Sequence, residues 1–230
     1  MRARRMLASG QNPTGKAVDV CHRISPLLIA ELQEALDELH ATGHARVPRR
    51  DPKTVVPDAY PGTQLPLFTL DNTGQLQVSE LSWGFDAPVG SRSRLVFNTR
   101  IETALAQARS GTGLWARPIT EGRCLVPVRS FYESWTKEPP RRGAQARFTL
   151  PGHRVFLLAG VCDHERFSVM TTTPNAAVGA VHTRMPLVLG PGESSVWLGE
   201  DYASLVDRTA IELACELDPE APAERQPSLL

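Results

Sequence analysis

The amino-acid sequence predicts an α+β fold in which a curved, barrel-like and mostly antiparallel sheet carries flanking helices. Short runs of apolar and β-branched residues, each bounded by turn residues, recur from residue 64 onward, and such runs are typical of strands. Only a few stretches have apolar residues at helical spacing, so helices accompany the sheet rather than alternate with its strands. The length of 230 residues suits one domain with tails.

One amphipathic helix is predicted over residues 26–41. Ser25 is a suitable N-cap, Pro26 suits the first helical position, and Gly43 is a typical stop. The apolar face consists of leucines at helical spacing, namely Leu28, Leu32, Leu36 and Leu39. Cys21 lies just upstream of this predicted helix.

The strands and two further helices follow a proline-rich, irregular stretch from Arg46 to Thr63. Strands are expected at residues 64–70, 76–81, 94–98, 124–129, 154–161, 166–172 and 186–189. Helices are expected at residues 101–109 and 203–217, and the segment KEPPRRGAQ is expected to form a polar hairpin loop.

The chain divides into one domain and two tails. Residues 1–20 have no periodicity and are expected to be a disordered or misassigned extension. Residues 21–217 form the predicted domain, and residues 218–230 resemble a disordered acidic tail. No internal repeat is visible.

Composition excludes several classes of protein. No run of 18 apolar residues indicates a membrane helix, and the basic N-terminus lacks the apolar region of a secretory signal. The cysteines, Cys21, Cys124, Cys162 and Cys215, are too widely spaced for a CxxC metal site or a disulfide framework. A reducing cytoplasm with free thiols, and no bound metal, is therefore expected.

Charge is distributed unevenly, although the formal net charge is zero. Between Ser91 and Arg147 the chain has eleven Arg or Lys residues against four acids, whereas eight acids against two arginines follow from Glu200 onward. The basic middle either follows a phosphate backbone or is simply a solvated surface, and charge alone does not decide between these interpretations.

Polar residues at strand ends form the candidate site. P-loop, GxGxxG, HExxH and GxSxG motifs do not occur, so the common nucleotide-binding, metalloprotease and serine-hydrolase sites are not predicted. Taken singly, Asn98 suits a helix cap, Glu133 a rim carboxylate paired with an arginine, and His182 a structural histidine. Together with Cys21 they form a set that can converge on one pocket.

These residues lie in motifs that resemble the SOS-response-associated peptidase (SRAP) family. The chain has CHR at 21–23, WGF at 83–85, NTRIET at 98–103, RCLVPVRSFYESW at 123–135, MTTTPN at 170–175 and HTRMP at 182–186. The similarity extends from Cys21 to Leu198, and the order and spacing of the motifs make a chance match improbable.

The resemblance implies a role for each candidate residue. Cys21 matches the family's terminal cysteine, whose α-amine and thiol trap the aldehyde of an abasic site in single-stranded DNA as a thiazolidine. Asn98 matches the asparagine that orients the reacting end, Glu133 the general acid/base near the α-amine, and His182 the histidine that promotes opening of the sugar ring.

The same resemblance implies DNA-binding residues and no cofactor. Arg23, Arg100 and Arg184 are candidate phosphate clamps, because the guanidinium fork suits phosphate oxygens. Trp83 is a candidate for stacking on a base beside the lesion, with core packing as its alternative. Thiazolidine formation needs no metal or organic cofactor, and the protein is expected to act as a cytoplasmic monomer with no membrane partner.

Two departures from the family pattern affect the prediction. His22 occupies the family's glycine position, which crowds the site or restricts the backbone. Twenty residues precede Cys21 and residue 20 is Val, so the sequence as written has no α-amine at Cys21. Either Val20 is read as the initiator methionine and removed, or the chain cleaves itself before Cys21, or cross-linking has been lost and only DNA binding remains.

Three classes of function therefore compete. The first is a DNA–protein cross-linker of the SOS response with associated autoproteolytic peptidase or lyase activity. The second is a cysteine peptidase that acts on other proteins through Cys21, His182 and Glu133, although no substrate pocket is recognisable. The third is a non-catalytic single-strand DNA-binding module, whose binding is salt-dependent and survives Cys21→Ala.

Overall fold

The computed structural model describes residues 21–42, 54, 56–91, 93–137 and 144–218. Its strands are β1 (Arg23–Pro26), β2 (Gln64–Leu70), β3 (Leu76–Trp83), β4 (Phe85–Asp86), β5 (Leu95–Val96), β6 (Asn98–Arg100), β7 (Arg123–Ser134), β8 (Gln145–Thr149), β9 (Phe156–Cys162), β10 (Arg166–Thr172), β11 (Met185–Pro186), β12 (Val188–Leu189) and β13 (Ala214–Asp218). Its helices are α1 (Ile29–Thr42), α2 (Ile101–Ser110), α3 (Ala116–Glu121), α4 (Ala176–Gly179), α5 (Glu193–Leu198) and the 3₁₀ helix η1 (Glu200–Val206).

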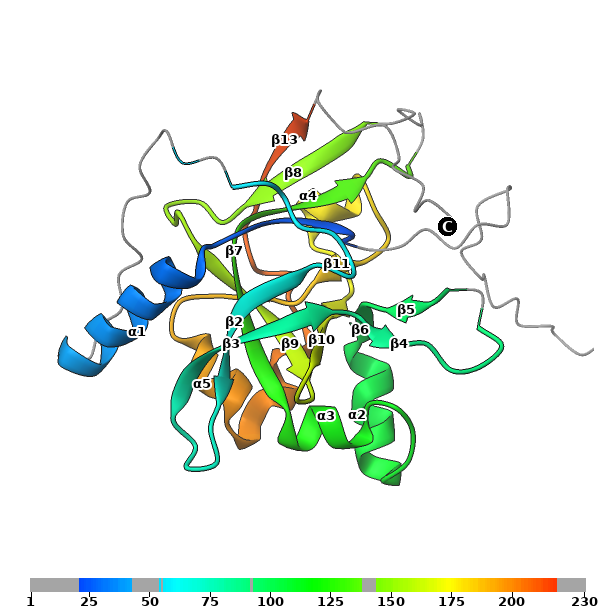
Figure 1. Ribbon diagram of the computed structural model, residues 1–230. Helices are drawn as coiled ribbons and strands as arrows, with labels where there is room; N and C mark the ends of the chain where they lie inside the picture. Colours follow the sequence, from blue (N-terminus) through cyan, green and yellow to red (C-terminus); the bar gives the residue numbers. More distant parts are fainter. Residues whose placement is uncertain (1–20, 43–53, 55, 92, 138–143, 219–230) are drawn as a thin grey trace, which may run out of the picture.

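Five strands close into a barrel-like sheet (Figure 1). The order is β9, β10, β3, β2 and β7, and a long antiparallel pairing of β7 with β9 completes the ring. β3 and β10 run parallel, whereas the other four pairs are antiparallel. A closed ring removes the exposed edges of these strands, and this confirms the predicted curved, mostly antiparallel sheet.

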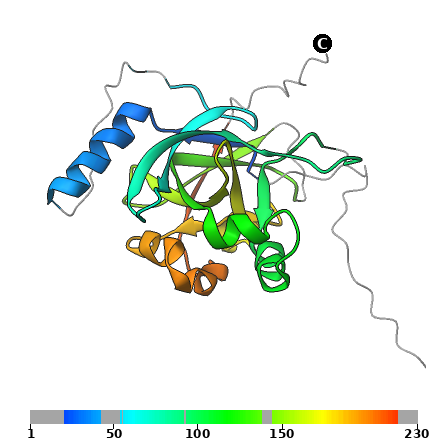
Figure 2. The same cartoon turned by 60° about the horizontal axis from the view of Figure 1, so that its bottom comes forward.

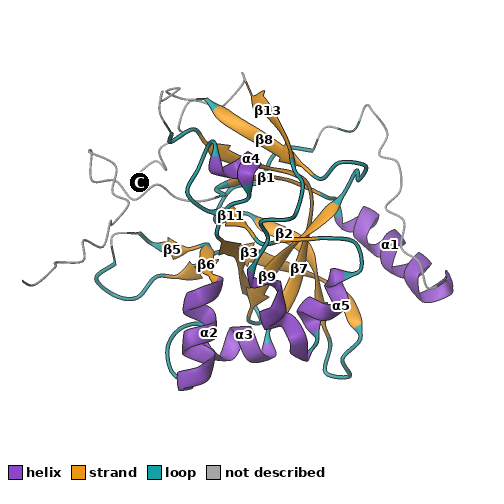
Figure 3. Ribbon diagram, turned by 180° about the vertical axis from the view of Figure 1, so that it is seen from behind, coloured by secondary structure: helices purple, strands orange, loops and turns teal. Residues whose placement is uncertain are grey.

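Shorter strands extend the sheet beyond the barrel. β7 continues past the ring and pairs with β1 on one side and with β8 on the other, and β13 then pairs with β8 (Figure 3). β6 joins β10 in parallel and β11 joins it in antiparallel orientation. These additions bring the segments around residues 21, 98, 133 and 182 to the same end of the barrel.

Helices cover the opposite part of the barrel (Figure 2). α2, α3, α5 and η1 bury apolar side chains against β7, β9 and β10, whereas α1 buries only one side of its surface and extends away from the barrel. A second cluster of buried residues extends from the barrel strands to β8 at the far end of β7, with Trp83, Phe131, Phe148 and Phe167 among its largest members. No helix of the described residues is long and apolar enough to cross a membrane.

Most predicted elements are present, and the exceptions have local causes. Residues 64–70 and 166–172 are strands with the predicted bounds, and the helix at 101–109 extends by one residue. The helix predicted from Pro26 begins at Ile29 instead, because Ser25 and Pro26 pair with β7. The helix predicted at 203–217 is wrong: η1 ends at Val206, and 214–218 form a strand paired with β8.

Some predictions concern residues outside those that the structure describes. These are the tail at 1–20, residues 46–53 and 55 of the irregular stretch from Arg46 to Thr63, the end of the chain from residue 219, and the middle of the predicted hairpin loop. The strands that flank this loop do pair as β7 and β8.

The close approach of β7 to β9 gives a test of barrel closure. A Cβ atom at Gly160 would lie 2.8 Å from Cys124 Sγ and 3.1 Å from Val126 Cγ2, both on β7. We expect Gly160→Ala to lower the free energy of unfolding by about 1–3 kcal/mol, because a packed core tolerates extra volume poorly. Urea denaturation measures the effect, and Gly179→Ala, whose Cβ would meet only Pro174 at 3.8 Å, is the control that should be neutral.

Candidate functional site

Cys21 and Glu133 form the centre of the site. Cys21 lies two residues before the start of β1, and the pairing of β1 with β7 brings its main chain beside Glu133. The backbone nitrogen of Cys21 donates a hydrogen bond to Glu133 Oε2 at 3.0 Å, and both residues are fully buried. Cys21 has a φ of 41°, and it is the only non-glycine residue with positive φ in the described part of the chain. Such a strained conformation is often found at functional sites.

His182 and Asn98 complete the site from two other segments. His182 follows α4, is 1% exposed, and places Nδ1 3.8 Å from Glu133 Oε2. Asn98 begins β6 and donates its side-chain amide to the carbonyl oxygen of Cys21 at 3.5 Å. The N-cap of α2 is Arg100, so Asn98 is not the cap of that helix. The four residues predicted to act together are therefore brought together.

Burial sets the electrostatics of the site. Desolvation raises the pKa of Glu133 well above its usual range, and only the hydrogen bond from Cys21 opposes this shift. Desolvation lowers the pKa of His182; the hydrogen bond to the backbone of Arg184 opposes this shift, and the positive charges of His22 and Lys137 add to it. Burial also raises the pKa of the Cys21 thiol, and the charge of Glu133 adds to that effect. The carboxyl therefore binds a proton more readily than usual, and the imidazole less readily.

Arg23 is a structural residue rather than a free phosphate clamp. Its guanidinium contacts Asp58 and Asp218, each at 2.6 Å, and it stacks 3.9 Å above the ring of Tyr132. It also donates to Gln145. The prediction that Arg23 binds phosphate is corrected, because its guanidinium is already paired with two carboxylates. The pair with Asp218 joins β1 to β13, the last strand of the sheet.

Trp83 belongs to the core. It is fully buried, its indole nitrogen donates to the carbonyl of Phe97 at 3.0 Å, and its ring stacks on Phe167 with 6.2 Å between centroids. A side chain held in this way presents no free face to a base. The prediction that Trp83 stacks on DNA is therefore wrong, and the alternative of core packing holds.

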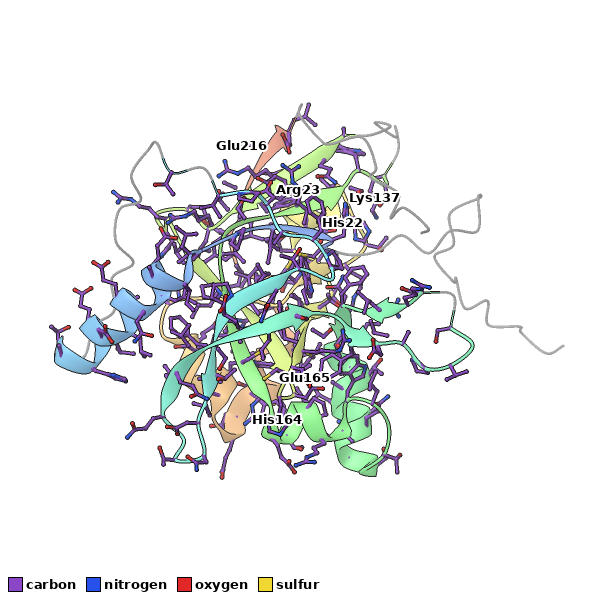
Figure 4. The ribbon with its side chains drawn as sticks, viewed as in Figure 1. His22, Arg23, Lys137, His164, Glu165 and Glu216 are labelled. Carbon is purple, nitrogen blue, oxygen red and sulfur yellow. The ribbon has the colours of Figure 1, made fainter. Side chains whose placement is uncertain are left out.

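Arg184 and Arg100, the other two candidate phosphate clamps, differ in their surroundings. Arg184 forms two hydrogen bonds to the carboxylate of Glu102, at 2.6 and 2.9 Å, and a third to the carbonyl of Thr171 at 2.8 Å. Arg100 is exposed, and its positive charge helps to lower the pKa of Glu102. Lys137 is exposed at the end of β7 and lies with His22 at the same end of the molecule, far from His164 and Glu165 (Figure 4).

Sequence reasoning missed several residues that shape the site. Lys137, Gln145, Glu102 and Thr171 act on the candidate residues through contacts between distant segments. Glu102 was visible inside NTRIET, but nothing in the sequence indicated its partner. No group of three or more potential metal ligands occurs among the described residues.

The chain belongs to the SOS response associated peptidase (SRAP) family. The sequence model of this family matches residues 21–218, which is most of the chain. The match begins at Cys21 and ends at the last residue of β13.

Curated relatives match a shorter part of the chain. The abasic site processing protein YoqW of Bacillus subtilis is 26% identical over 144 residues, covering 57% of this chain and 62% of the relative. The abasic site processing protein YedK of Escherichia coli is 27% identical over 150 residues, covering 62% and 64%. The chain thus matches less than two thirds of the length of these relatives.

Solved structures share the fold. A protein from Bordetella bronchiseptica superimposes with a TM-score of 0.61 at 18% identity, covering 86% of this chain and 99% of the other. A protein from Bacteroides thetaiotaomicron gives 0.59 at 19% identity, covering 86% and 91%. At such identities the likeness establishes the fold alone.

The buried carboxyl makes stability depend on pH. The pKa of Glu133 is raised in the folded state above the value of about 4.3 in an unfolded chain. The stability that the protonated Glu133 gives the fold is therefore fully present below the pKa of the unfolded chain. It is lost as the pH rises through the pKa of Glu133 in the folded protein. We expect Glu133→Gln to melt at least about 2–4 °C higher than the wild type at pH 8, with little difference at pH 4. Calorimetry measures this, Glu80→Gln on the exposed face of β3 is the control, and a less stable variant at pH 8 would contradict the argument.

The Arg23 network gives a further stability prediction. Arg23→Ala leaves Asp58 and Asp218 partly buried without their partner, and breaking such a network costs about 3–5 kcal/mol. We expect a loss in this range in urea denaturation. Arg109→Ala, at an exposed position of α2, should change stability by less than about 0.5 kcal/mol. Equal stability of the two variants would mean that the network contributes nothing.

Proposed function

We propose that this protein processes abasic sites in single-stranded DNA by forming a covalent thiazolidine with Cys21. One observation carries the proposal: the backbone nitrogen of Cys21 lies 3.0 Å from a buried carboxyl oxygen, which is itself 3.8 Å from His182 Nδ1. When Cys21 is the first residue, this nitrogen is the α-amine. The names of the curated relatives, abasic site processing proteins, agree with the proposal.

The chemistry requires an amine and a thiol on the same residue. The open form of an abasic site has an aldehyde, which condenses with the α-amine to an imine and releases water. The thiol then adds across the imine, with its sulfur bonding to the carbon and its proton passing to the nitrogen, and closes a five-membered ring. A free α-amine has a pKa of about 7.7–8.0, so a large fraction is neutral and nucleophilic near neutral pH.

Glu133 and His182 supply the proton transfers. Because its pKa is raised, Glu133 exchanges protons nearer to neutral pH than an ordinary glutamate, and it can accept a proton from the amine and return one to the leaving water. His182, whose pKa is lowered, is neutral at pH 7 and takes up a proton before it donates one to the sugar ring oxygen. Asn98 holds the carbonyl of Cys21 and so orients the reacting end.

Positive charge near the site suits a nucleic-acid ligand. Arg100 and Lys137 are both exposed, and both come from segments that directly adjoin site residues. They are the candidates for phosphate contacts, in place of Arg23. The proposed substrate is single-stranded because a lesion must reach a buried thiol. We further propose that the protein acts as a monomer in the cytoplasm.

The peptidase alternative is less well supported. A cysteine peptidase uses a thiolate whose pKa is lowered by a neighbouring cation, whereas burial and Glu133 raise the pKa of Cys21. No hydrogen bond joins the Cys21 thiol to His182 in the described part of the chain. A single self-cleavage before Cys21 is still compatible with the proposal, since it would create the α-amine that the cross-link needs.

The proposal is tested with a single-stranded oligonucleotide that contains one abasic site. We expect a chain that begins at Cys21 to form an adduct that survives a denaturing gel, and Cys21→Ser to form no thiazolidine adduct while it still binds DNA. Cys215→Ser, at an exposed cysteine of β13, is the matched control and should cross-link normally. Arg100→Ala should weaken binding and reduce its dependence on salt by about one charge.

The full 230-residue chain, assayed alongside, separates the possibilities at the N-terminus. An adduct from the full chain, with a new N-terminus at Cys21 in the mass spectrum, means self-cleavage. An adduct from the shortened chain alone means that Cys21 must be exposed by another route. If neither chain forms an adduct while both bind DNA, the protein is a binding module and the cross-linking proposal fails.

A further inference from the structure

Arg184 connects His182 of the site with Glu102, a carboxylate that no step of the proposed chemistry uses. Its guanidinium is held by both oxygens of Glu102 on α2, at 2.6 and 2.9 Å, and by the carbonyl of Thr171 on β10, at 2.8 Å. The Arg184 side chain is only 14% exposed, whereas Glu102 is 49% exposed. The paired contact fixes the direction of the guanidinium as well as its position.

The main chain of Arg184 in turn holds the imidazole of His182. His182 Nδ1 lies 3.1 Å from the carbonyl oxygen of Arg184 and 3.3 Å from its backbone nitrogen. The carbonyl oxygen can only accept a hydrogen bond, so its contact requires a proton on Nδ1, whereas the backbone N–H of Arg184 can donate only to an unprotonated Nδ1. Because the carbonyl contact is the shorter of the two, the proton of a neutral His182 is assigned to Nδ1, which leaves the lone pair on Nε2.

We propose that Glu102 is a positioning residue, which acts through Arg184 to hold His182 in the tautomer with its proton on Nδ1. The juxtaposition that supports this is a continuous series of contacts from α2 through Arg184 to a histidine that is 1% exposed. The role in catalysis rests on the proposed function, whereas the control of the tautomer does not. A fixed tautomer leaves Nε2 as the nitrogen that accepts and donates protons in the reaction.

The groups around His182 determine whether its pKa rises or falls when Glu102 is replaced by glutamine. Glu133 on β7 faces it as an acid, and His22, Lys137 and Arg184 are the bases around it, while Arg100 interacts with Glu102. Neutralising Glu102 leaves the charge of Arg184 without its partner carboxylate. An Arg184 that is no longer held weakens the hydrogen bond between Nδ1 and its own carbonyl oxygen, and because that bond raises the pKa of His182, the pKa should fall.

Glu102→Gln in the full chain tests the tautomer directly. Long-range ¹⁵N–¹H spectra of the histidine side chains distinguish the two ring nitrogens, and His182→Gln identifies the resonance of His182. We expect the wild type to have Nδ1 protonated, and Glu102→Gln to show a mixture of tautomers with titration at lower pH. Glu121→Gln, which removes the exposed partner of Arg117 on α3, is the matched control and should leave His182 unchanged.

The pH profile of cross-linking tests the catalytic consequence in the chain with Cys21 as its first residue. His182→Gln should reduce the rate about 100-fold or more, and Glu102→Gln about tenfold with its profile displaced to lower pH. An unchanged tautomer and titration in Glu102→Gln would overturn the proposal, and would mean that the pairing of β11 with β10 alone fixes Arg184. If the wild type forms no adduct, the proposed function fails, and the spectra still decide the role of Glu102.

Discussion

The Glu133 carboxyl lies where solvent does not reach it, and the rest of the site is arranged around this constraint. An ionised carboxylate without water must be compensated, and Glu133 receives one hydrogen bond, from the nitrogen of Cys21, with His182 3.8 Å away. Its other oxygen has no hydrogen-bond partner among the described residues. The incomplete compensation raises the pKa of the carboxyl, so Glu133 holds its proton at a higher pH than an exposed glutamate does.

The closed barrel makes this arrangement possible. β7 is long enough to belong to the ring at one end and to pair with β1 and β8 at the other, so Glu133 is held by strands on both sides. β10 holds β6 and β11 in the same way, and these short strands place Asn98 and Arg184. Rigid strands therefore position residues that lie as much as 161 positions apart, namely Cys21 and His182.

Arginines in this protein divide into those that hold the fold and those that remain available. Arg23 and Arg184 are engaged by carboxylates, and Arg123 donates to carbonyl groups at the ends of α3 and α5. Within the basic middle of the sequence, Arg123 and Arg129 serve such internal contacts. Exposed residues such as Arg100 and Lys137 remain available to a polyanion, so the count of basic residues overstates the charge that a ligand can meet.

The sequence by itself determined the class of fold, most of the strands, the family, and the residues Cys21, Asn98, Glu133 and His182 as one set. The fold class and the strands follow from alternation and turn residues, which are properties of neighbouring positions, whereas the family follows from the order and spacing of motifs that resemble it. Only the tertiary structure decided that 214–218 pair as a strand, that Trp83 is buried, and that carboxylates engage Arg23 and Arg184. Each of these depends on a partner far away in the chain, and burial and ion pairing are set by that partner rather than by the residue's own neighbours.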